Sequence, residues 1–426
     1  MKWLLLILLG LLTQGVIAQL STNDIHADYT TYNRREKFDL YLRDTAIAEA
    51  FKMPLDSDGE YGYDAACSAA SQYMIANKDV EAGLRTMIDQ YDSLQNSTKQ
   101  SFFEAIFGLY PHDYSAEIKK FFDKELQPKF FAMEAVYLLA NDASVNNRAY
   151  LLALLDARFP NIDSNQLLLQ LRDYLSNHDK YTHQPIPDIT TLFANQKVLQ
   201  QKVIYSFQRW NRDYPGLAIL QNDDGTFAKD STGKLLVFRQ LARSTGNLPY
   251  FITDGNTPQG IYSITGVQVS RNHLLGPTPN IQMVMPFEDD QAYWGDTYDN
   301  SKDALTNYVN LLPAAWQQYK PITEAFYAGK IGRSAIICHG TTLNPNYFSG
   351  KSYYPISPTL GCLCAKEIWD TQTGKLQESE QLRLINAFKA TPNNIGYVMV
   401  INLDDKQAAV SREEVEKLVE RYEKGR

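Results

Sequence analysis

The chain contains few cysteines and histidines, and it lacks an excess of positive charge. Four cysteines and six histidines occur among its 426 residues, and the formal net charge is −8. Disulfide scaffolds pack many cysteines into a short chain, so this is not one of them. A negative net charge gives no electrostatic support to nucleic-acid binding, and we expect no nucleic-acid partner.

Long apolar runs are also scarce, apart from one at the start. The stretch MKWLLLILLGLLTQGVIAQLS has Lys2, an apolar core over 3–12 and small residues near Ala18, the pattern of a secretory signal peptide. The core is shorter than the ~20 residues that a membrane span needs. We therefore expect residues 1–18 to be removed and the mature protein to be exported, periplasmic or extracellular, with no membrane span.

The first half of the chain has the apolar periodicity of helices. Between 97 and 177, five segments carry apolar residues at intervals of three and four, with breaks at Pro111, Pro128 and Pro160. Short helices joined by tight turns predict a helical domain over 19–185, with hairpins like those of a HEAT-type solenoid. An ordinary helical bundle fits the same pattern. A linker helix is expected within 186–214.

The second half changes to a strand pattern with turn residues between apolar runs. Segments such as GLAILQ, KLLVFRQL and NIGYVMVINL predict strands, TPQGIYSITGVQVS a strand pair, and IGRSAIICHG a buried strand. The largest insertion, 274–330, includes an expected helix over 301–329. Ser411 and Glu414 form a capping box for a C-terminal helix within 406–426. The predicted class is α+β: an all-α helical-hairpin domain, then a mostly β domain over 215–405 with inserted helices.

His339-Gly340 and Gly361-Cys362 bracket a loop rich in Tyr, Asn and Pro. A thiol near a histidine, or near backbone N–H groups of a turn, becomes nucleophilic because its pKa is lowered. The residues alone leave a buried, inert cysteine as an alternative. Zinc is a further alternative, but the spacing is unusual and neighbouring strand residues face opposite sides. We expect no metal and no cofactor.

Three ordered motifs resemble those of the YkuD-type L,D-transpeptidase catalytic domain. That family carries a His-Gly, a loop and then Ser/Thr-His-Gly-Cys. His339-Gly340-Thr341 is similar to the first part and Thr359-Leu360-Gly361-Cys362 to the second. Upstream, RSTGNLPYFITDGNTPQGIYSI resembles the family's Ser-Thr-Gly and Thr-Pro-x-Gly patterns. The resemblance covers 215–405.

The resemblance implies a peptidoglycan L,D-transpeptidase with a cysteine nucleophile. Cys362 is then expected to attack the carbonyl between an L-centre residue and D-Ala of a stem peptide, and His339 to be its base. A stem-peptide amine, or water, releases the acyl-enzyme. The residues expected to hold the oxyanion, steer the base or bind substrate are Gly361, Leu360, Gly340, Thr341, Ser357 and Thr359.

The chain departs from the family pattern beside the cysteine. Leu360 replaces the histidine before Gly-Cys, and Leu363-Cys364 replaces a pair that is usually polar. These differences leave an L,D-carboxypeptidase or endopeptidase on the same site as one alternative. A non-catalytic envelope protein, whose helical half binds another envelope protein, is a second.

Aromatic residues near the bracketed loop suit an amphipathic stem peptide or a sugar face. Long inserted loops are commonly lids or binding loops. We therefore expect a lid or groove wall formed by Tyr293, Trp294, Tyr298, Tyr347, Tyr353 and Tyr354.

Overall fold

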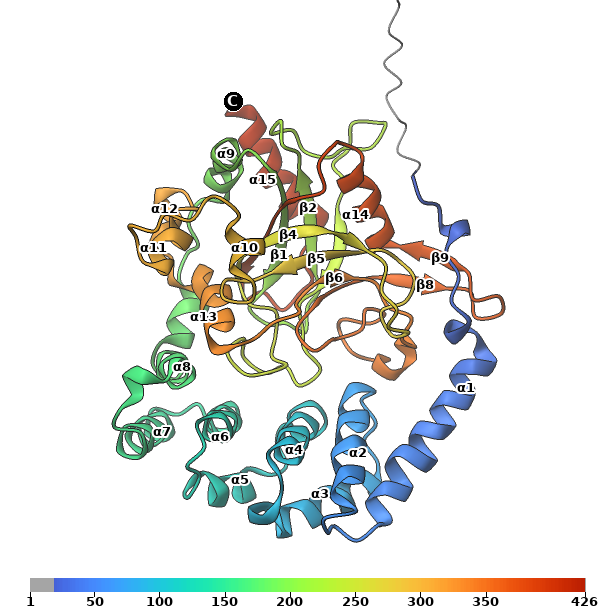
Figure 1. Cartoon of the computed structure of the whole chain (residues 1–426), viewed down its shortest axis with the longest axis vertical. Coiled ribbons are helices and arrows are strands. Elements are labelled where there is room, and N and C mark those ends of the chain that lie inside the picture. The colour runs from blue at the N-terminus through green and yellow to red at the C-terminus, as the bar shows by residue number, and fades with distance from the viewer. Residues whose placement is uncertain (1–18, 426) are drawn as a thin grey trace, which may run out of the picture.

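The protein combines a set of helices with a closed β-barrel. The computed structural model describes residues 19–425, so the expected signal peptide over 1–18 lies outside the described part. Helices dominate up to residue 199, and an eight-stranded barrel follows (Figure 1). The mixed α+β class predicted from the sequence is confirmed.

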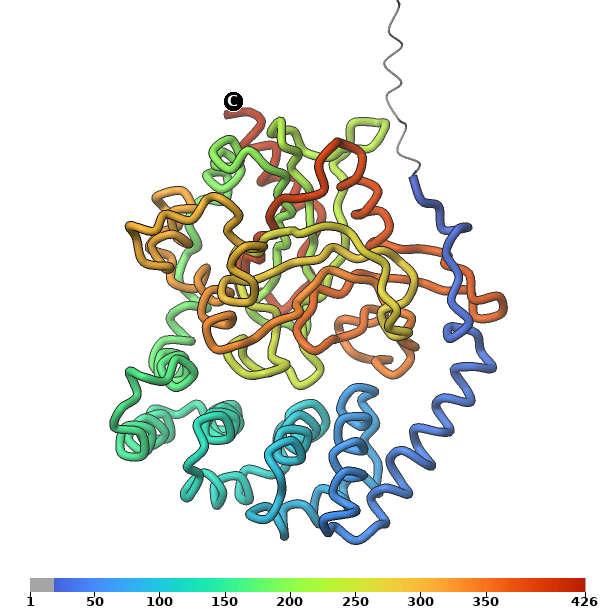
Figure 2. The backbone as a smooth tube through the Cα atoms, viewed as in Figure 1, coloured from blue at the N-terminus to red at the C-terminus, as the bar shows by residue number. Residues whose placement is uncertain are grey.

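The first helices form an arc that curves around one end of the barrel (Figure 2). Helix α2 packs on α4, α5 on α6, and α6 and α7 on α8. A π-helical segment, Tyr41–Glu49, continues α1. The helices are α1 (Tyr32–Leu40), α2 (Glu60–Gln72), α3 (Lys78–Asp89), α4 (Asn96–Leu109), α5 (Ser115–Phe122), α6 (Pro128–Asn141), α7 (Val145–Arg158) and α8 (Gln166–His183).

Local sequence signals explain where these helices begin. The side chains of Asn77, Ser144 and Asn165 accept hydrogen bonds from the first turns of α3, α7 and α8. Pro128 opens α6, where its missing N–H costs nothing. The five helical segments predicted between 97 and 177 all form helices in the structure.

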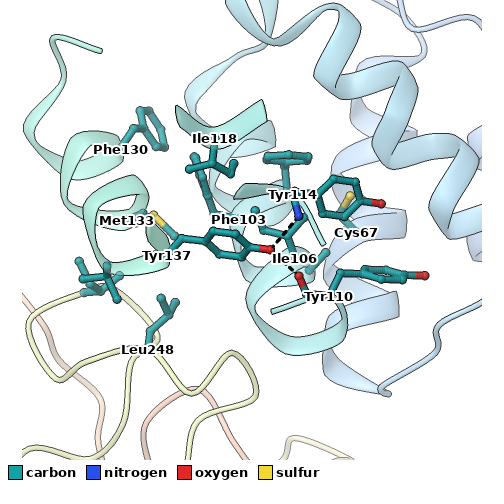
Figure 3. Close-up of a cluster of buried hydrophobic side chains, with 14 of the residues drawn as sticks. Cys67, Phe103, Ile106, Tyr110, Tyr114, Ile118, Phe130, Met133, Tyr137 and Leu248 are labelled. Carbon is teal, nitrogen blue, oxygen red and sulfur yellow. Dashed lines mark hydrogen bonds between the residues drawn. The ribbon is translucent and has the colours of Figure 1, made fainter. Parts of the chain in front are cut away.

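Tyr137 of α6 joins two other helices inside the apolar core of the arc (Figure 3). Its hydroxyl donates to the carbonyl of Tyr110 at 2.6 Å and accepts from the N–H of Tyr114 at 3.2 Å. These two groups stand at the end of α4 and the start of α5, where helices leave backbone groups unpaired. Leu248 from the barrel half belongs to the same core, so the helices and the barrel share a packed interface.

The barrel closes because its first strand pairs with both the second and the last. The order around the barrel is β1-β10-β4-β5-β6-β7-β3-β2. Strand β1 runs parallel to β10 and antiparallel to β2. The strands are β1 (Lys202–Arg209), β2 (Gly216–Gln221), β3 (Phe238–Leu241), β4 (Gly260–Gln268), β5 (Asn280–Val284), β6 (Cys338–His339), β7 (Leu363–Ala365) and β10 (Gly396–Asp404), with β8 (Glu367–Trp369) and β9 (Leu376–Ser379) as a separate hairpin.

The expected linker helix over 186–214 is wrong in its second half. Helix α9 (Ile189–Leu199) ends at Gln200, whose φ is 51°, and β1 begins at Lys202. Alternation explains the strand: Val203, Tyr205 and Phe207 pack in one apolar cluster, and Ile204 packs in another. A closed barrel buries both faces of this strand, so its apolar run resembles a buried helix in sequence.

Helices fill and cover the barrel. Helix α14 (Glu380–Lys389) contributes Leu384, Ile385 and Phe388 to the cluster inside the barrel. Helix α15 (Arg412–Lys424) packs outside with α9, and its predicted capping box between Ser411 and Glu414 is present. Both helices seal strands that would otherwise face water.

Two further expectations for the second half need correction. The helix expected over 301–329 is divided into α11 (Ala304–Val309), α12 (Ala314–Gln317) and α13 (Glu324–Ile331), with breaks at Pro313 and Pro321. TPQGIYSITGVQVS forms one strand, β4, and not a pair. Only the end of IGRSAIICHG is a strand, because residues 333–337 form no ladder.

Replacing Tyr137 by Phe should lower the free energy of unfolding by about 1–3 kcal/mol, because the Tyr114 N–H loses its partner and the Tyr110 carbonyl keeps only a long bond from the Asp113 N–H at 3.4 Å. Urea denaturation followed by circular dichroism measures the loss. The control is Tyr61→Phe, since Tyr61 is 83% exposed. Equal stability of the two variants would contradict the role of the Tyr137 hydroxyl.

Candidate active site around Cys362

A tight turn built around Gly361 presents Cys362. Gly361 has a φ of +118°, and a Cβ there would lie 2.3 Å from the Arg333 guanidinium. The Thr359 hydroxyl accepts from the Gly361 N–H at 3.1 Å and donates to the Cys362 carbonyl at 2.9 Å. Only glycine fits this turn, because other residues meet both the φ penalty and the clash.

Strands β6 and β7 bring the two ends of the bracketed loop together. They pair in parallel, with Cys338 opposite Leu363 and His339 opposite Cys364. Cys338 and Leu363 belong to the cluster inside the barrel. Since side chains alternate along a strand, His339 and Cys364 lie on the outer face, and Cys362 directly precedes β7. The pairing therefore brings the turn that carries the predicted nucleophile next to the strand that carries the predicted base.

His339 is buried and has a defined tautomer. Its Nδ1 lies 2.5 Å from the Gly340 carbonyl oxygen, which can only accept, so Nδ1 carries the proton and Nε2 is the free acceptor. Burial lowers the pKa of His339 to about 4, against a smaller opposing effect of this hydrogen bond. The imidazole is thus neutral at pH 7, as a general base must be. No hydrogen bond joins it to Cys362 within residues 19–425.

Glu367 fixes the backbone that follows His339. Its carboxylate accepts from the Thr341 N–H at 2.8 Å and from the Ser379 hydroxyl at 2.6 Å. A Cβ on Gly340 would lie 2.1 Å from the Glu367 carboxyl carbon. Gly340 is therefore needed for close packing on an acid that sequence analysis did not single out.

The Cys362 thiol is half-buried and held by backbone groups. Its Sγ lies 3.5 Å from the Ala335 carbonyl oxygen and 3.5 Å from the Ile337 nitrogen. Burial raises the pKa of Cys362 to about 11, while the Ile337 N–H and then Arg333 act in the opposite direction. The resting thiol is therefore neutral, and it both accepts from the Ile337 N–H and donates to the Ala335 carbonyl.

Ala335 adopts a strained conformation beside the thiol. Its φ of +59° lies in the left-handed region, which costs a non-glycine residue about 1–2 kcal/mol. The Glu288 carboxylate accepts from the Ala335 N–H at 2.7 Å and stabilises this backbone. Strain of this kind gathers at functional sites.

Arg333 is the main group at the site that sequence analysis missed. Its guanidinium donates to the carbonyls of Tyr250, Asn256 and Gly255 at 2.6, 2.9 and 2.8 Å. It is 8% exposed and forms no ion pair among the described residues. A buried cation next to Gly361 favours negative charge on the sulfur or on an oxygen near it. The only sequence signal for Arg333 is that it is a charged residue within an apolar stretch.

Asp254 lies near the thiol and forms an acidic pair with Glu104 of the helical half. Asp254 accepts from Gln100 of α4 at 3.2 Å. Burial, followed by the nearby Asp254 charge, raises the pKa of Glu104 to about 8. Asp254 also raises the pKa of Cys362, which places its negative charge close to the sulfur. The helical arc therefore contributes to the electrostatics of the candidate site.

Several residues expected to bind substrate or oxyanion are buried or already hydrogen-bonded within the protein. The Gly361 N–H is already bonded to Thr359, so it does not serve an oxyanion. The Thr341 hydroxyl donates to the Leu274 carbonyl at 3.0 Å, and Ser357 is 2% exposed. Leu360 is 52% exposed and is the one that faces solvent directly beside the turn.

The lid expectation needs correction for most of its aromatic residues. Tyr293 and Trp294 of α10 (Asp290–Trp294) are buried against β4, and Tyr298 packs on Trp294. These three help to hold the insertion on the barrel. Tyr353 is 1% exposed and Tyr347 packs against Tyr73 of the arc, with ring centres 5.2 Å apart. Tyr354, 47% exposed, is the member of the set that is open to solvent.

The remaining cysteines differ sharply from Cys362. All four are free, and burial raises the pKa of Cys67, Cys338 and Cys364 far above the usual range. Cys338 faces the barrel interior while its neighbours face outward, so the four proposed zinc ligands do not converge. No cluster of three or more metal-ligating side chains occurs in residues 19–425.

Comparison with known proteins adds no relative. No protein-family model, curated protein or solved structure matches this chain. Within the described residues, none of the helices has both the length and the apolar content to cross a membrane. The chemistry of the site must therefore be argued from its geometry.

Alkylation of Cys362 should rise about tenfold per pH unit from pH 7 to 10, because its pKa of about 11 keeps most of the thiol protonated below that range. Asp254→Asn removes a charge that raises this pKa, so the variant should react severalfold faster at pH 8. Mass spectrometry after iodoacetamide treatment measures both rates. Asp58→Asn, at an exposed position, is the control; equal rates in both variants would exclude Asp254 from the site.

Proposed function

We propose that the protein is an exported, cysteine-dependent L,D-transpeptidase that acts on peptidoglycan stem peptides. The observation that carries this proposal is the parallel pairing of β6 with β7, which brings the strand of His339 next to the turn of Cys362. The sulfur is the accessible thiol among the described cysteines, and the imidazole is neutral with Nε2 free. The motif resemblance over 215–405 supplies the substrate class.

The reaction begins with attack of the Cys362 sulfur on the carbonyl carbon between the L-centre residue and D-Ala. The thiol proton passes to His339 Nε2 as the carbon–sulfur bond forms, since a resting ion pair is disfavoured by the two pKa values. The carbonyl oxygen takes the negative charge. The Arg333 guanidinium, whose charge acts on Cys362, is the cation that we assign to stabilise this oxygen.

Collapse of this intermediate breaks the carbon–nitrogen bond. His339 returns the proton to the leaving amine of D-Ala, and a thioester remains on Cys362. An amine of a second stem peptide then attacks the thioester carbonyl carbon and gives up its proton to His339. The carbon–sulfur bond breaks as the new carbon–nitrogen bond is completed, and His339 returns the proton to the Cys362 sulfur. Water in the place of that amine yields the carboxypeptidase or endopeptidase product, so a product assay for crosslinks against free stems separates the two reactions.

For the helical arc we propose a solenoid-like role in binding a second envelope protein. Its support is the stepwise packing of α2 on α4 and of α6 on α8. Exposed apolar side chains, Tyr61, Leu126 and Val145, lie on this arc. Gln100 of the arc donates a hydrogen bond to Asp254, whose negative charge lies beside Cys362. A partner that binds the arc is thereby connected to the charge at the candidate site.

Cys362→Ala should abolish both stem-peptide turnover and acylation by a carbapenem, because the variant lacks the nucleophile. The mass of the intact protein after carbapenem treatment reports the adduct. Cys364→Ala is the matched control, since Cys364 is buried and should not be acylated. An adduct that persists in Cys362→Ala and disappears in Cys364→Ala would mean that the other thiol is the nucleophile. No adduct in any form would favour the non-catalytic envelope protein.

His339→Gln should lower the acylation rate by a factor on the order of 10²–10⁴, the usual loss when a general base is removed. Stopped-flow measurement of carbapenem acylation at pH 7 gives the rate. The expected loss shrinks at high pH, where the thiol ionises without help. A rate near that of the unmodified protein at pH 7 would show that the turn alone activates Cys362.

A further inference from the structure

A cavity lies away from the Cys362 sulfur. Its volume is about 520 Å³, and it opens between α8, the loop over 247–257 and the connection that follows β1. Neither Cys362 nor His339 lines it. The proposed acyl transfer therefore makes no use of this cavity.

The cavity holds a buried guanidinium with an unused donor. Arg212 is 5% exposed, and its Nη2 donates to the Thr257 carbonyl at 3.0 Å. Its Nη1 has no hydrogen-bond partner among residues 19–425. The charge of Glu324 acts on Arg212 from nearby but does not satisfy Nη1, and both Glu324 oxygens accept from Gln259, at 2.9 and 3.1 Å. A buried charged donor without an acceptor is costly, and a ligand oxygen removes that cost.

The cavity also holds an unused acceptor. Asn402, near the end of β10, is 2% exposed and lines the cavity, and its Oδ1 has no hydrogen-bond partner in the described part of the chain. Asn402 and Glu324 are tied to the same residue, since Gln259 Oε1 accepts from the Asn402 N–H at 2.9 Å. One unsatisfied donor and one unsatisfied acceptor therefore stand in a single cavity.

The walls of the cavity suit an organic ligand and not a bare ion. His178 lies between Tyr174 and Trp210, with ring centres 4.4 Å from the first and 5.8 Å from the second. Such faces pack well against apolar or planar groups. At the rim, Asp405 accepts from the Asn211 N–H and forms no ion pair among the described residues. Its carboxylate favours a cationic group on the ligand.

We propose that this cavity binds an α-amino acid unit, either as a free amino acid or as the carboxyl end of a peptide. The ligand carboxylate accepts from Arg212 Nη1, as guanidinium groups prefer. A ligand N–H donates to Asn402 Oδ1, and the side chain lies along the aromatic wall. The proposal does not depend on the chemistry of Cys362, because it rests on a different set of residues.

Titration calorimetry with the full chain tests the carboxylate requirement. The probes are alanine and phenylalanine in both enantiomers, their carboxamides, and the dipeptide Ala-Phe. We expect a free carboxylate to be essential, so the carboxamides should bind about tenfold or more weakly. Tighter binding of the dipeptide than of phenylalanine identifies a peptide end as the natural ligand, and the reverse identifies a free amino acid. Equal binding of acids and amides, or no binding of any probe at millimolar concentration, overturns the proposal.

Variants of residues that line the cavity test whether the measured binding takes place there. Arg212→Met should abolish it, whereas Arg271→Met, at an exposed position, should leave it unchanged. Since Arg212 also holds the Thr257 backbone, Trp210→Ala serves as a second variant that leaves the guanidinium in place, and it should weaken binding severalfold. Thermal unfolding checks that each variant is folded. Unchanged binding in the folded Arg212→Met or Trp210→Ala protein overturns the proposal.

Discussion

The parallel pairing of β6 with β7 is the constraint on which the candidate site depends. It places His339 opposite Cys364, and so brings the start and the end of a long loop onto one outer face. The pairing is short, so other contacts must hold it. Gly340 packs on the buried Glu367, and Gly361 packs on the buried Arg333. Each glycine permits an approach that a larger residue prevents.

Charge around the thiol is balanced and not simply positive. Arg333 lowers the pKa of Cys362, whereas burial and Asp254 raise it, and the thiol stays protonated. A neutral thiol resists oxidation and stray alkylation, since the thiolate is the reactive form. A substrate that shields Asp254 from the sulfur lowers the pKa of Cys362 and so favours the thiolate. Because Gln100 of the helical arc holds Asp254 by a hydrogen bond, the arc influences the pKa of the thiol.

Sequence patterns predicted the helices better than the strands. Helices α4 to α8 have apolar faces, prolines and capping residues in the chain itself, so their existence needed no tertiary information. The sequence of β1 predicts a helix because both faces of the strand are buried, which removes the alternation of apolar and polar residues that marks a strand. The segment before His339 has the pattern of a strand, but the buried Arg333 and the positive φ of Ala335 break the ladder there.

Only some residues of the candidate site could be predicted from the sequence. The cysteine and the histidine stood out because each adjoins a glycine. Arg333 and Glu367 are close to the two motifs in sequence, but only the fold shows that Gly361 packs on one and Gly340 on the other. Asp254 comes from another part of the chain and reaches the site only through folding. The aromatic residues of the insertion were expected at the surface, but Tyr293 donates to the Ile261 carbonyl and is part of the core. Composition alone does not tell a binding aromatic from a packing one.

The barrel closes through strands that are far apart in the chain. Strand β1 pairs with β10, so Lys202 lies opposite Gly396. During synthesis the barrel therefore stays open until almost the whole chain has emerged, whereas the helical arc is complete much earlier. Non-local pairing of this kind slows folding. The helices are thus available as a packed surface before the barrel forms, and residues such as Leu248 can dock on them first. The order of the chain gives the arc a second role, as the template on which the late-closing barrel assembles.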